Sequence, residues 1–276
     1  MTARELVRSL VAISGGSLSA PWKRRLAQQR LMLSTTRSNA KSAPFRGQVL
    51  DFEMEAYSRD AFVALFDDVF ATGTYLFESD NPQPRILDCG SNIGFSVAFF
   101  KALYPQASIV AFEPSASAFK MLQANIARNR LNDVQAHQLA LGAVEGPVDF
   151  YIDPENPGSL TMSTLRERLS KEKATVQQAC LSRFVDGPVD LLKLDVEGVE
   201  DAVLGDLVAS GRIDRIKEMA IEYHHHIAPK DDHLGSFLGT LERSGFGYQI
   251  RSSVGMGLRA SAPGEFQDLL IRAYRK

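Results

Sequence analysis

The sequence predicts an α/β fold in which a doubly wound, mostly parallel sheet of seven strands follows an N-terminal helical extension. Three observations predict this class. From residue 85 onward, short runs of β-branched residues alternate with amphipathic helical segments, an order typical of βαβ units. A glycine loop joins the first strand to the first helix of this series, and acidic residues stand at the ends of later strands. The 276 residues are enough to bury a sizeable core.

The composition narrows the class of protein. Apolar residues make up 45% of the chain and charged residues 23%, as in ordinary globular proteins. The chain has no run of eighteen or more apolar residues, so no membrane-spanning helix is expected. The N-terminal stretch "ISGGSLSA" is a poor core for a secretory signal. Cys89 and Cys180 are far apart and Cys89 lies in an apolar run, which predicts free thiols and a cytoplasmic location.

Residues 1–46 differ from the rest of the chain in charge. They contain nine Lys and Arg residues and one acid, Glu5, a net charge of +8, and the overall charge of −2 therefore leaves −10 for the remainder. We interpret the segment as a partly ordered, solvated extension; contact with the acidic body or with an anionic membrane surface is the alternative. Nucleic acid is not an expected partner, because Trp22 is the one aromatic residue among the basic ones.

The N-terminal part, residues 1–80, is predicted as a basic helical extension with a lid, and residues 81–276 as the main domain. Residues 34–44 read as a linker. From Tyr57 to Phe77, apolar residues recur at helical spacing until Gly73, which predicts a helix that flanks or covers the main domain.

The main domain follows in strand and helix order. Its first helices are predicted over residues 95–105 and 115–130, the second with Ser115 as its N-cap, and a third over 199–211. A polar excursion over residues 142–187, with a hairpin-like stretch at 146–159, is the predicted acceptor-facing loop. The seven predicted strands are 85–90, 108–114, 133–141, 189–198, 216–224, 246–253 and 266–274, and the last two are expected to add an antiparallel edge.

The loop "DCGSNIG" indicates a ligand site, because ligands of such sheets bind beyond the carboxyl ends of the strands. Gly90 and Gly94 lack Cβ atoms, so we expect positive φ angles and a close approach of the backbone to the ligand. The spacing is not the GxGxxG pattern of dinucleotide sites, which disfavours a nicotinamide oxidoreductase. Asp88 would repel phosphate and attract a cation, which points to S-adenosylmethionine. Glu113, nineteen residues after Gly94, is placed to accept from ribose hydroxyls.

Seven motifs together resemble the FkbM-type family of class I S-adenosylmethionine-dependent methyltransferases. They are LFDDVFATGTY, ILDCGSNIG, AFEP, LQANIARN, ALGAVEG, DLLKLDVEGVE and IEYH. The resemblance implies a Rossmann-like class I methyltransferase fold and O-methylation of a hydroxyl on a sugar, glycolipid or specialised metabolite.

The resemblance also implies site residues. The cofactor's methionine part would lie against the glycine loop, its ribose at Glu113, and its adenine beside Ala140 and Leu141. The cofactor-binding residues implied or predicted are Asp88, Gly90, Ser91, Asn92, Gly94, Glu113, Ala140, Asp195 and Glu197. Ser91 stands where the family more often has alanine.

The stretch "KLDVEGVE" is expected to carry the chemistry. Side chains alternate along a strand, so Lys193, Asp195 and Glu197 would share one face, with the two acids at the methyl group. Alignment of the reacting atoms supplies on the order of 7–11 kcal/mol, and a general base a further factor of about 10²–10⁴. We predict His224, after Glu222 in "IEYH", as the base or its positioning partner, with Asp195 as the rival.

Asp195, Glu222 and His224 are also a candidate site for one divalent ion, Mg²⁺ or Ca²⁺, that would orient the acceptor's hydroxyls. The expected partner is a small-molecule or saccharide acceptor. Two other functions stay open: N-methylation of an amine or nucleotide, and a binding protein without turnover. Whether the chain forms a homo-oligomer is also left open.

Overall fold

The computed structural model describes residues 3–35, 43–153, 162–166, 172–225, 227, 233–252 and 267–276. Within these ranges, none of the helices is long and apolar enough to cross a membrane. Cys89 is buried, Cys180 is partly exposed, and both are free, as predicted. Most of the predicted linker, residues 36–42, lies outside the described ranges.

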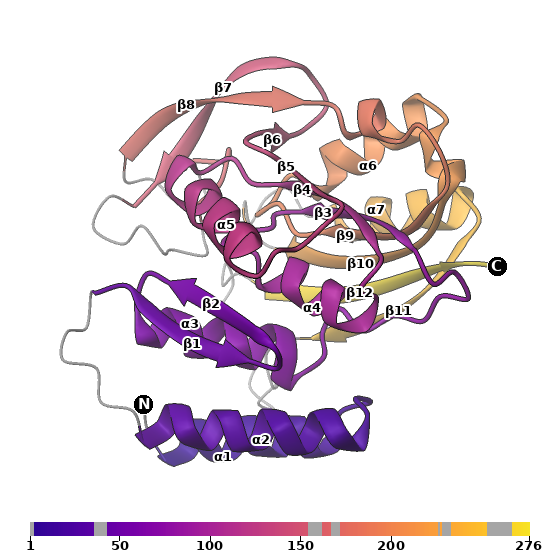
Figure 1. The fold of residues 1–276 in the computed structure, drawn as a ribbon. Coiled ribbons are helices and arrows are strands. Elements are labelled where there is room, and N and C mark those ends of the chain that lie inside the picture. The colour runs from indigo at the N-terminus through magenta and orange to yellow at the C-terminus, as the bar shows by residue number, and fades with distance from the viewer. Residues whose placement is uncertain are drawn as a thin grey trace.

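The predicted seven-stranded sheet is confirmed, in the order β11-β12-β10-β9-β3-β4-β5 (Figure 1). Six strands run in the same direction, and β12 runs antiparallel to both of its neighbours, β10 and β11, so the expected antiparallel edge is present. Strand bounds are β3 Arg85–Cys89, β4 Ser108–Phe112, β5 Val134–His137, β9 Val189–Leu194, β10 Ile216–His225, β11 Phe246–Ser252 and β12 Gln267–Arg275.

Helices cover both faces of this sheet. They are α4 Phe95–Leu103, α5 Ala116–Arg128, α6 Glu200–Ala209 and α7 Leu234–Arg243, with short 3₁₀ turns η2 Leu181–Phe184 and η3 Arg212–Arg215. Neighbouring residues of one strand enter different cores: Ile86 packs with α4 and α5, and Leu87 packs with α6 and α7. Side chains alternate across a strand, so each face of the sheet needs its own helical layer. Ser115 caps α5 as predicted, accepting from the Ala118 amide.

The predicted third strand divides in two. Residues 134–137 form β5 in the main sheet, whereas β6 (Ala140–Leu141) pairs with β8 (Glu172–Ala179) in a second, three-stranded sheet of order β6-β8-β7. The stretch expected as a hairpin supplies β7 (Gly146–Ile152), which pairs antiparallel with β8. Residues 154–159 of that stretch lie outside the described ranges. The chain therefore changes sheets at residues 138–139, beside the main sheet's carboxyl edge.

The N-terminal extension is helical, as expected, and also contains a small sheet. Its elements are α1 Ala3–Gly15, α2 Ala20–Thr35, β1 Phe45–Val49, β2 Phe52–Ala56, α3 Arg59–Leu65 and the π-helical turn η1 Phe66–Ala71. Helices α1 and α2 lie side by side at one end of the molecule, beyond β1 and β2 (Figure 1).

The predicted flanking helix is formed by α3 and η1 together. It begins at Arg59 after the N-cap Ser58, whose side chain accepts from the Ala61 amide. Its aromatic side chains join the core of the main domain: the Phe62 ring lies 5.2 Å from the Phe95 ring, edge to face. This packing brings η1 to the carboxyl edge of the sheet, where the candidate site lies.

Candidate active site

A pocket lies beyond the carboxyl ends of β3, β4 and β9, where the sequence predicted a ligand. The side chains that line it come from η1, the glycine loop, the ends of β4 and β9, strand β10 and the 142–187 excursion. Of the predicted site residues, the pocket is lined by Gly90, Ser91, Asn92, Glu113, Ala140, Asp195, Glu197 and Glu222. Asp88, Gly94 and His224 do not line it and lie behind its wall.

The two glycines have the positive φ angles expected, +84° at Gly90 and +92° at Gly94. The structure also gives a reason within the protein for the absence of side chains. A Cβ atom on Gly90 would lie 1.8 Å from the carbonyl oxygen of Asp195, and one on Gly94 would lie 2.7 Å from Leu122 Cδ1. The glycines therefore make room for the end of strand β9 and for helix α5, and the close approach of the loop backbone to a ligand stays a prediction.

Asp88 is fully buried beneath the loop. Its Oδ2 accepts a 2.6 Å hydrogen bond from the Ser96 hydroxyl on α4, and its Oδ1 lies 3.5 Å from the Lys193 ammonium. The carboxylate thus fixes the first turn of α4 against β9. Asp88 would favour a cationic ligand through the negative charge that it places beneath the pocket. A direct contact between Asp88 and the ligand stays a prediction.

Glu113 joins the end of β4 to the glycine loop. Its Oε2 accepts from the Asn92 amide at 2.9 Å and its Oε1 from the Ser115 amide at 2.8 Å. Asn92 has a φ of +46°, a strained value that this bond helps to hold. Burial raises the pKa of Glu113 to about 7, although both amides oppose the shift. The carboxyl group lines the pocket, as a ribose-binding acid must.

Lys193 is the buried cation under the pocket, and it ties β3 to β9. Its ammonium donates to the Gly90 carbonyl at 2.7 Å and to Asp195 Oδ2 at 3.2 Å, and lies 5.1 Å from the centre of the Tyr75 ring. Burial lowers the pKa of Lys193, but Asp195 and Asp88 outweigh it and hold that pKa well above its usual value. Its role is to fix Asp195, which agrees with the predicted shared face of Lys193 and Asp195.

Acidic groups outnumber basic ones around this pocket. Among its described lining residues, five are acidic and one, Lys193, is basic. Burial, followed by the charge of Asp195, raises the pKa of Asp68 to about 6. Asp195, followed by burial, raises the pKa of Glu222 to about 9, so Glu222 holds its proton at neutral pH. The pocket is built to attract positive charge.

Two of these contributors were not predicted from the sequence. Asp68 comes from η1 and Tyr75 from the segment after it; the Tyr75 hydroxyl lies 3.5 Å from Asp195 Oδ2. Asp68 follows Leu65 by three residues, so it falls on the apolar stripe of the flanking helix. Asp68 is exposed in the structure, and an acid at the border of an apolar stripe was the signal that could have revealed it.

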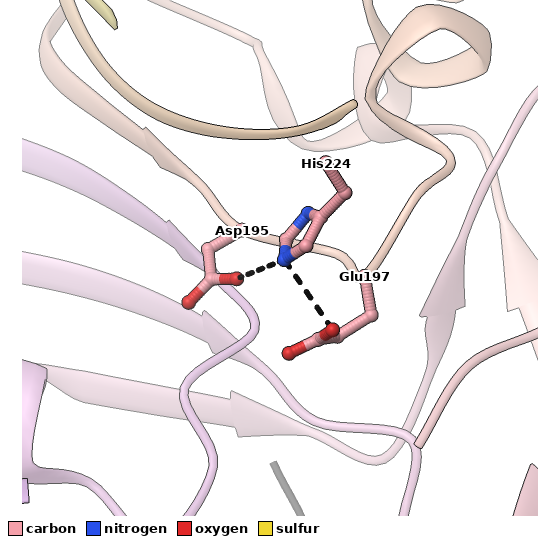
Figure 2. Close-up of side chains that lie close together, drawn as sticks. All are labelled: Asp195, Glu197 and His224. Carbon is pink, nitrogen blue, oxygen red and sulfur yellow. Dashed lines mark ion pairs between the residues drawn. The ribbon is translucent and has the colours of Figure 1, made fainter. Parts of the chain in front are cut away.

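His224 lies among carboxylates behind the pocket wall. Its Nε2 points toward Glu197 at 3.3 Å and Asp195 at 4.0 Å, as Figure 2 shows, while its Nδ1 lies 2.8 Å from Glu200 Oε1. Burial lowers the pKa of His224, but Glu200 and its neighbours outweigh burial and raise that pKa to about 10. A histidine that keeps its proton is a poor general base, so this geometry favours Asp195, the predicted rival.

Glu200 is a third residue that the sequence reasoning missed. It is 1% exposed at the start of α6. The same Oε1 that faces His224 also accepts from the Gly198 amide at 3.0 Å and the Val196 amide at 3.3 Å. Glu200 thereby closes the turn after β9 and orients the imidazole. Glu197 lies in that turn with a φ of +58°, which directs it toward His224 rather than along the strand.

The group that could hold a cation differs from the predicted one. Among the described residues, ligand atoms of Asp195, Glu197 and His224 lie within 4.8 Å of one another, in the arrangement drawn in Figure 2. The predicted set had Glu222 in place of Glu197. The turn after β9 explains the difference, because it brings Glu197 back over the imidazole.

The 142–187 excursion reaches the pocket, as its prediction as an acceptor loop requires. Phe150, Met162 and Thr164 line the pocket. The Ser163 hydroxyl donates to the Glu197 carbonyl at 2.6 Å, which fastens this segment to the turn after β9. That these residues contact the acceptor stays a prediction.

Comparison with known proteins shows which family and which proteins this chain is similar to. The methyltransferase FkbM domain family matches residues 88–250. Methyltransferase 1 of Beauveria bassiana (strain ARSEF 2860) is 30% identical over 144 residues, 44% of this chain and 57% of that protein. Methyltransferase sdnD of Sordaria araneosa is 31% identical over 51% of this chain and 66% of its own length. The 2-O-methyltransferase NoeI of Sinorhizobium fredii (strain NBRC 101917 / NGR234) is 27% identical over 48% of this chain and 59% of its own length. The chain thus matches less than two thirds of each relative.

Proposed function

The chain belongs to the FkbM methyltransferase family, and from this premise we propose that it is an S-adenosylmethionine-dependent O-methyltransferase. We propose a hydroxyl of a sugar, glycolipid or specialised metabolite as the acceptor. Similarity to NoeI, which is named a 2-O-methyltransferase, supports transfer to oxygen. The free thiols of Cys89 and Cys180 support a reducing, cytoplasmic location.

The observation that carries the proposal is the acid-rich pocket at the carboxyl edge of the sheet. S-adenosylmethionine, when bound, supplies a methyl group on a positively charged sulfonium and carries no phosphate. Asp68 and Asp195, which line the pocket, give it the negative charge that such a cation requires. Among the described lining residues the one basic side chain is Lys193, and it is committed to Gly90 and Asp195 rather than to a pyrophosphate. Glu113 would hold the ribose, with Ala140 and Leu141 beside the adenine.

Asp195 is the group we assign to take the acceptor's proton. It lines the pocket at the end of β9, and Lys193 holds its Oδ2. A carboxylate held in one orientation by a buried ammonium is positioned before the acceptor arrives, which is what alignment requires. Glu222, which keeps its proton at neutral pH because of its raised pKa, would donate a hydrogen bond to an acceptor oxygen.

His224 and Glu200 act behind Asp195 as positioning residues. Glu200 binds the imidazole Nδ1 and the turn after β9, while Nε2 faces Glu197 and Asp195. The positive charge of His224 offsets these acids and keeps the turn closed. A divalent cation bound by Asp195, Glu197 and Nε2 would offset the same acids in place of the proton, and we keep it as the second form of this proposal.

Calorimetry tests the cofactor first. S-adenosylhomocysteine is expected to bind and NAD is not. If S-adenosylhomocysteine leaves no binding signal, the proposed cofactor is wrong.

Turnover in the presence of a chelator tests the cation. Loss of turnover that Mg²⁺ restores would select the form of the proposal with a bound cation, and unchanged turnover would select the form with a protonated His224.

Turnover tests the residues. With labelled cofactor and a panel of glycosides, Asp195→Asn is expected to lose about 10²–10⁴ in kcat while S-adenosylhomocysteine still binds. Asp149→Asn, an exposed carboxylate on β7, is the matched control and should behave as wild type. Unchanged turnover in both Asp195→Asn and His224→Asn would remove the assignment.

N-methylation is the second candidate, and the acid-rich pocket is the observation that keeps it. The same charge that suits a sulfonium also attracts a protonated amine. The acceptor panel should therefore include amines, and mass spectrometry of the products decides whether the label lies on oxygen or nitrogen.

A further inference from the structure

We propose that the outer face of the α1–α2 pair binds the surface of an anionic phospholipid membrane. This face, which we call the hairpin face, consists of Arg4, Val7, Arg8 and Val11 on α1 and Arg24, Leu31 and Met32 on α2. It lies away from the pocket, so the proposal does not depend on the proposed methyl transfer.

The hairpin face on α1 follows from helical spacing. Arg4, Val7, Arg8 and Val11 are separated by three or four residues and therefore lie on one side of the helix. All four are exposed, with Val7 at 59% and Val11 at 65%. Ile13, on the other side, is 1% exposed in the core. Helix α1 therefore exposes valine side chains that do not take part in its packing on the body.

Helix α2 continues this face with the same mixture of residues. Leu31 is 46% and Met32 69% exposed, and Arg24 is exposed about two turns before them. The buried side of α2 is formed by Leu26, Arg30 and Leu33. Figure 1 shows the two helices side by side at one end of the molecule, so their exposed sides can meet one flat partner together.

The inner side of the pair is fixed to the body. Arg30 binds Asp67 of η1 with two hydrogen bonds of 2.7 and 2.8 Å, and Arg25 binds Asp51. The Trp22 ring packs edge to face on Phe99 at 6.2 Å. Within the extension, which we interpreted from the sequence as solvated and partly ordered, the described residues 3–35 are packed on the body, and the arginines of the hairpin face are those that these contacts do not use.

Charge favours an anionic partner and orients the protein on it. Residues 3–35 carry six basic side chains and one acid, Glu5, a net of +5. The chain after residue 46 carries −10. A negatively charged surface would repel the body and attract the pair, which turns the hairpin face toward the membrane although the whole protein is slightly acidic.

Lipid fits this face better than the other anionic or apolar partners. Exposed valine, leucine and methionine among arginines suit the boundary between headgroups and acyl chains. A nucleic acid would use aromatic stacking, and Trp22 is packed against Phe99. A second copy would bring two faces of the same positive charge together, which is unfavourable.

The test uses the full chain and vesicles of phosphatidylcholine, with or without 30% phosphatidylserine as a chosen composition. Cosedimentation should show binding to the anionic vesicles, no binding to the neutral ones, and loss of binding at high salt. Each arginine is expected to contribute about fivefold, so Arg4→Glu/Arg8→Glu/Arg24→Glu should weaken binding by at least about 100-fold. Val7→Ser/Val11→Ser should weaken it as well, at unchanged charge.

The matched control is Lys173→Glu/Arg183→Glu/Arg243→Glu, which makes the same charge change on exposed residues outside the pair and should keep nearly all binding. If the glutamate variant does not fold, as judged by circular dichroism, the corresponding glutamine variant replaces it. Five results would overturn the proposal: no vesicle binding, equal binding to neutral vesicles, equal loss in the control, no effect of the valine substitutions, or a dimer in solution that the valine substitutions abolish.

Discussion

Two buried cations of this protein lie in opposite electrostatic surroundings. Arg30, 0% exposed, pairs among the described residues with the carboxylate of Asp67 through two hydrogen bonds. Lys193, 2% exposed, lies within 3.5 Å of carboxylate oxygens of both Asp88 and Asp195. The first cation joins α2 to η1 with charges that cancel. The second holds a site in which acids remain in excess.

The difference separates a structural ion pair from a binding site. Where the charges of the two partners match, neither group changes its protonation state on folding, and the pair serves to hold two elements together. Where acids exceed bases, the surplus appears as raised pKa values at Asp68, Glu113 and Glu222, each with burial among its main causes. Such groups can be ionised again by a cationic ligand, so we interpret the surplus as the signature of binding.

The largest expected effect comes from breaking the matched pair. Arg30→Leu leaves Asp67 without its partner and should lower the free energy of unfolding by about 3–5 kcal/mol. Urea denaturation measures this, with S-adenosylhomocysteine binding as the readout for the pocket, which should persist. Arg25→Leu is the control, because its partner Asp51 is exposed and the change should cost less than about 1 kcal/mol. Equal losses in the two variants would contradict the distinction.

The next largest effect is a pH dependence of the free energy of unfolding that comes from Glu113 in the acid-rich pocket. The pKa of Glu113 is raised from 4.5 to about 7 in the folded protein. The folded state binds this proton more tightly than the unfolded state, so the stabilisation is complete below pH 4.5 and is lost as the pH rises through 7. The loss amounts to about 3 kcal/mol.

Denaturation of the wild type and of Glu113→Gln, compared at pH 5 and pH 8, isolates this contribution. The variant should lose less stability between the two pH values, whatever its stability at either one. A parallel pH dependence in the two proteins would show that Glu113 titrates normally in the folded state.

The smallest expected effect comes from replacing Lys193, the buried cation of the acid-rich pocket. Lys193→Met should cost about 1–3 kcal/mol, less than Arg30→Leu, although it leaves the Gly90 carbonyl without its donor. The cost is reduced because the surrounding acids can take up protons in place of the lost cation. Unfolding at pH 6 and pH 8 measures it, and the cost should be larger at pH 8. A cost that does not change with pH would mean that the acids do not compensate.

Much of the fold and part of the site could be predicted because their signals are local. The alternation of β-branched runs with helical stripes predicted the main sheet and three of its covering helices, and parallel strands then place residues at their carboxyl ends together. Glu113 and Asp195 were found in this way, and both line the pocket. Helix α7 and the strands β1 and β2 were missed. The signal for α7 was present, because Leu234, Phe237, Leu238 and Leu241 recur at helical spacing. Strands β1 and β2 have five residues each, which is too short for a clear alternation.

What the sequence by itself determined is the order of the elements, the edge of the sheet that carries the site and the opposite net charges of residues 1–46 and the rest of the chain. Only the tertiary structure decided which groups meet there. It placed Asp68 in the pocket and paired Glu200 with His224. It also brought the carbonyl of Asp195 so close to Gly90 that a side chain at position 90 has no room. These contacts join segments that are far apart in the chain, and their energies depend on burial and on surrounding charge, which no local pattern of residues records.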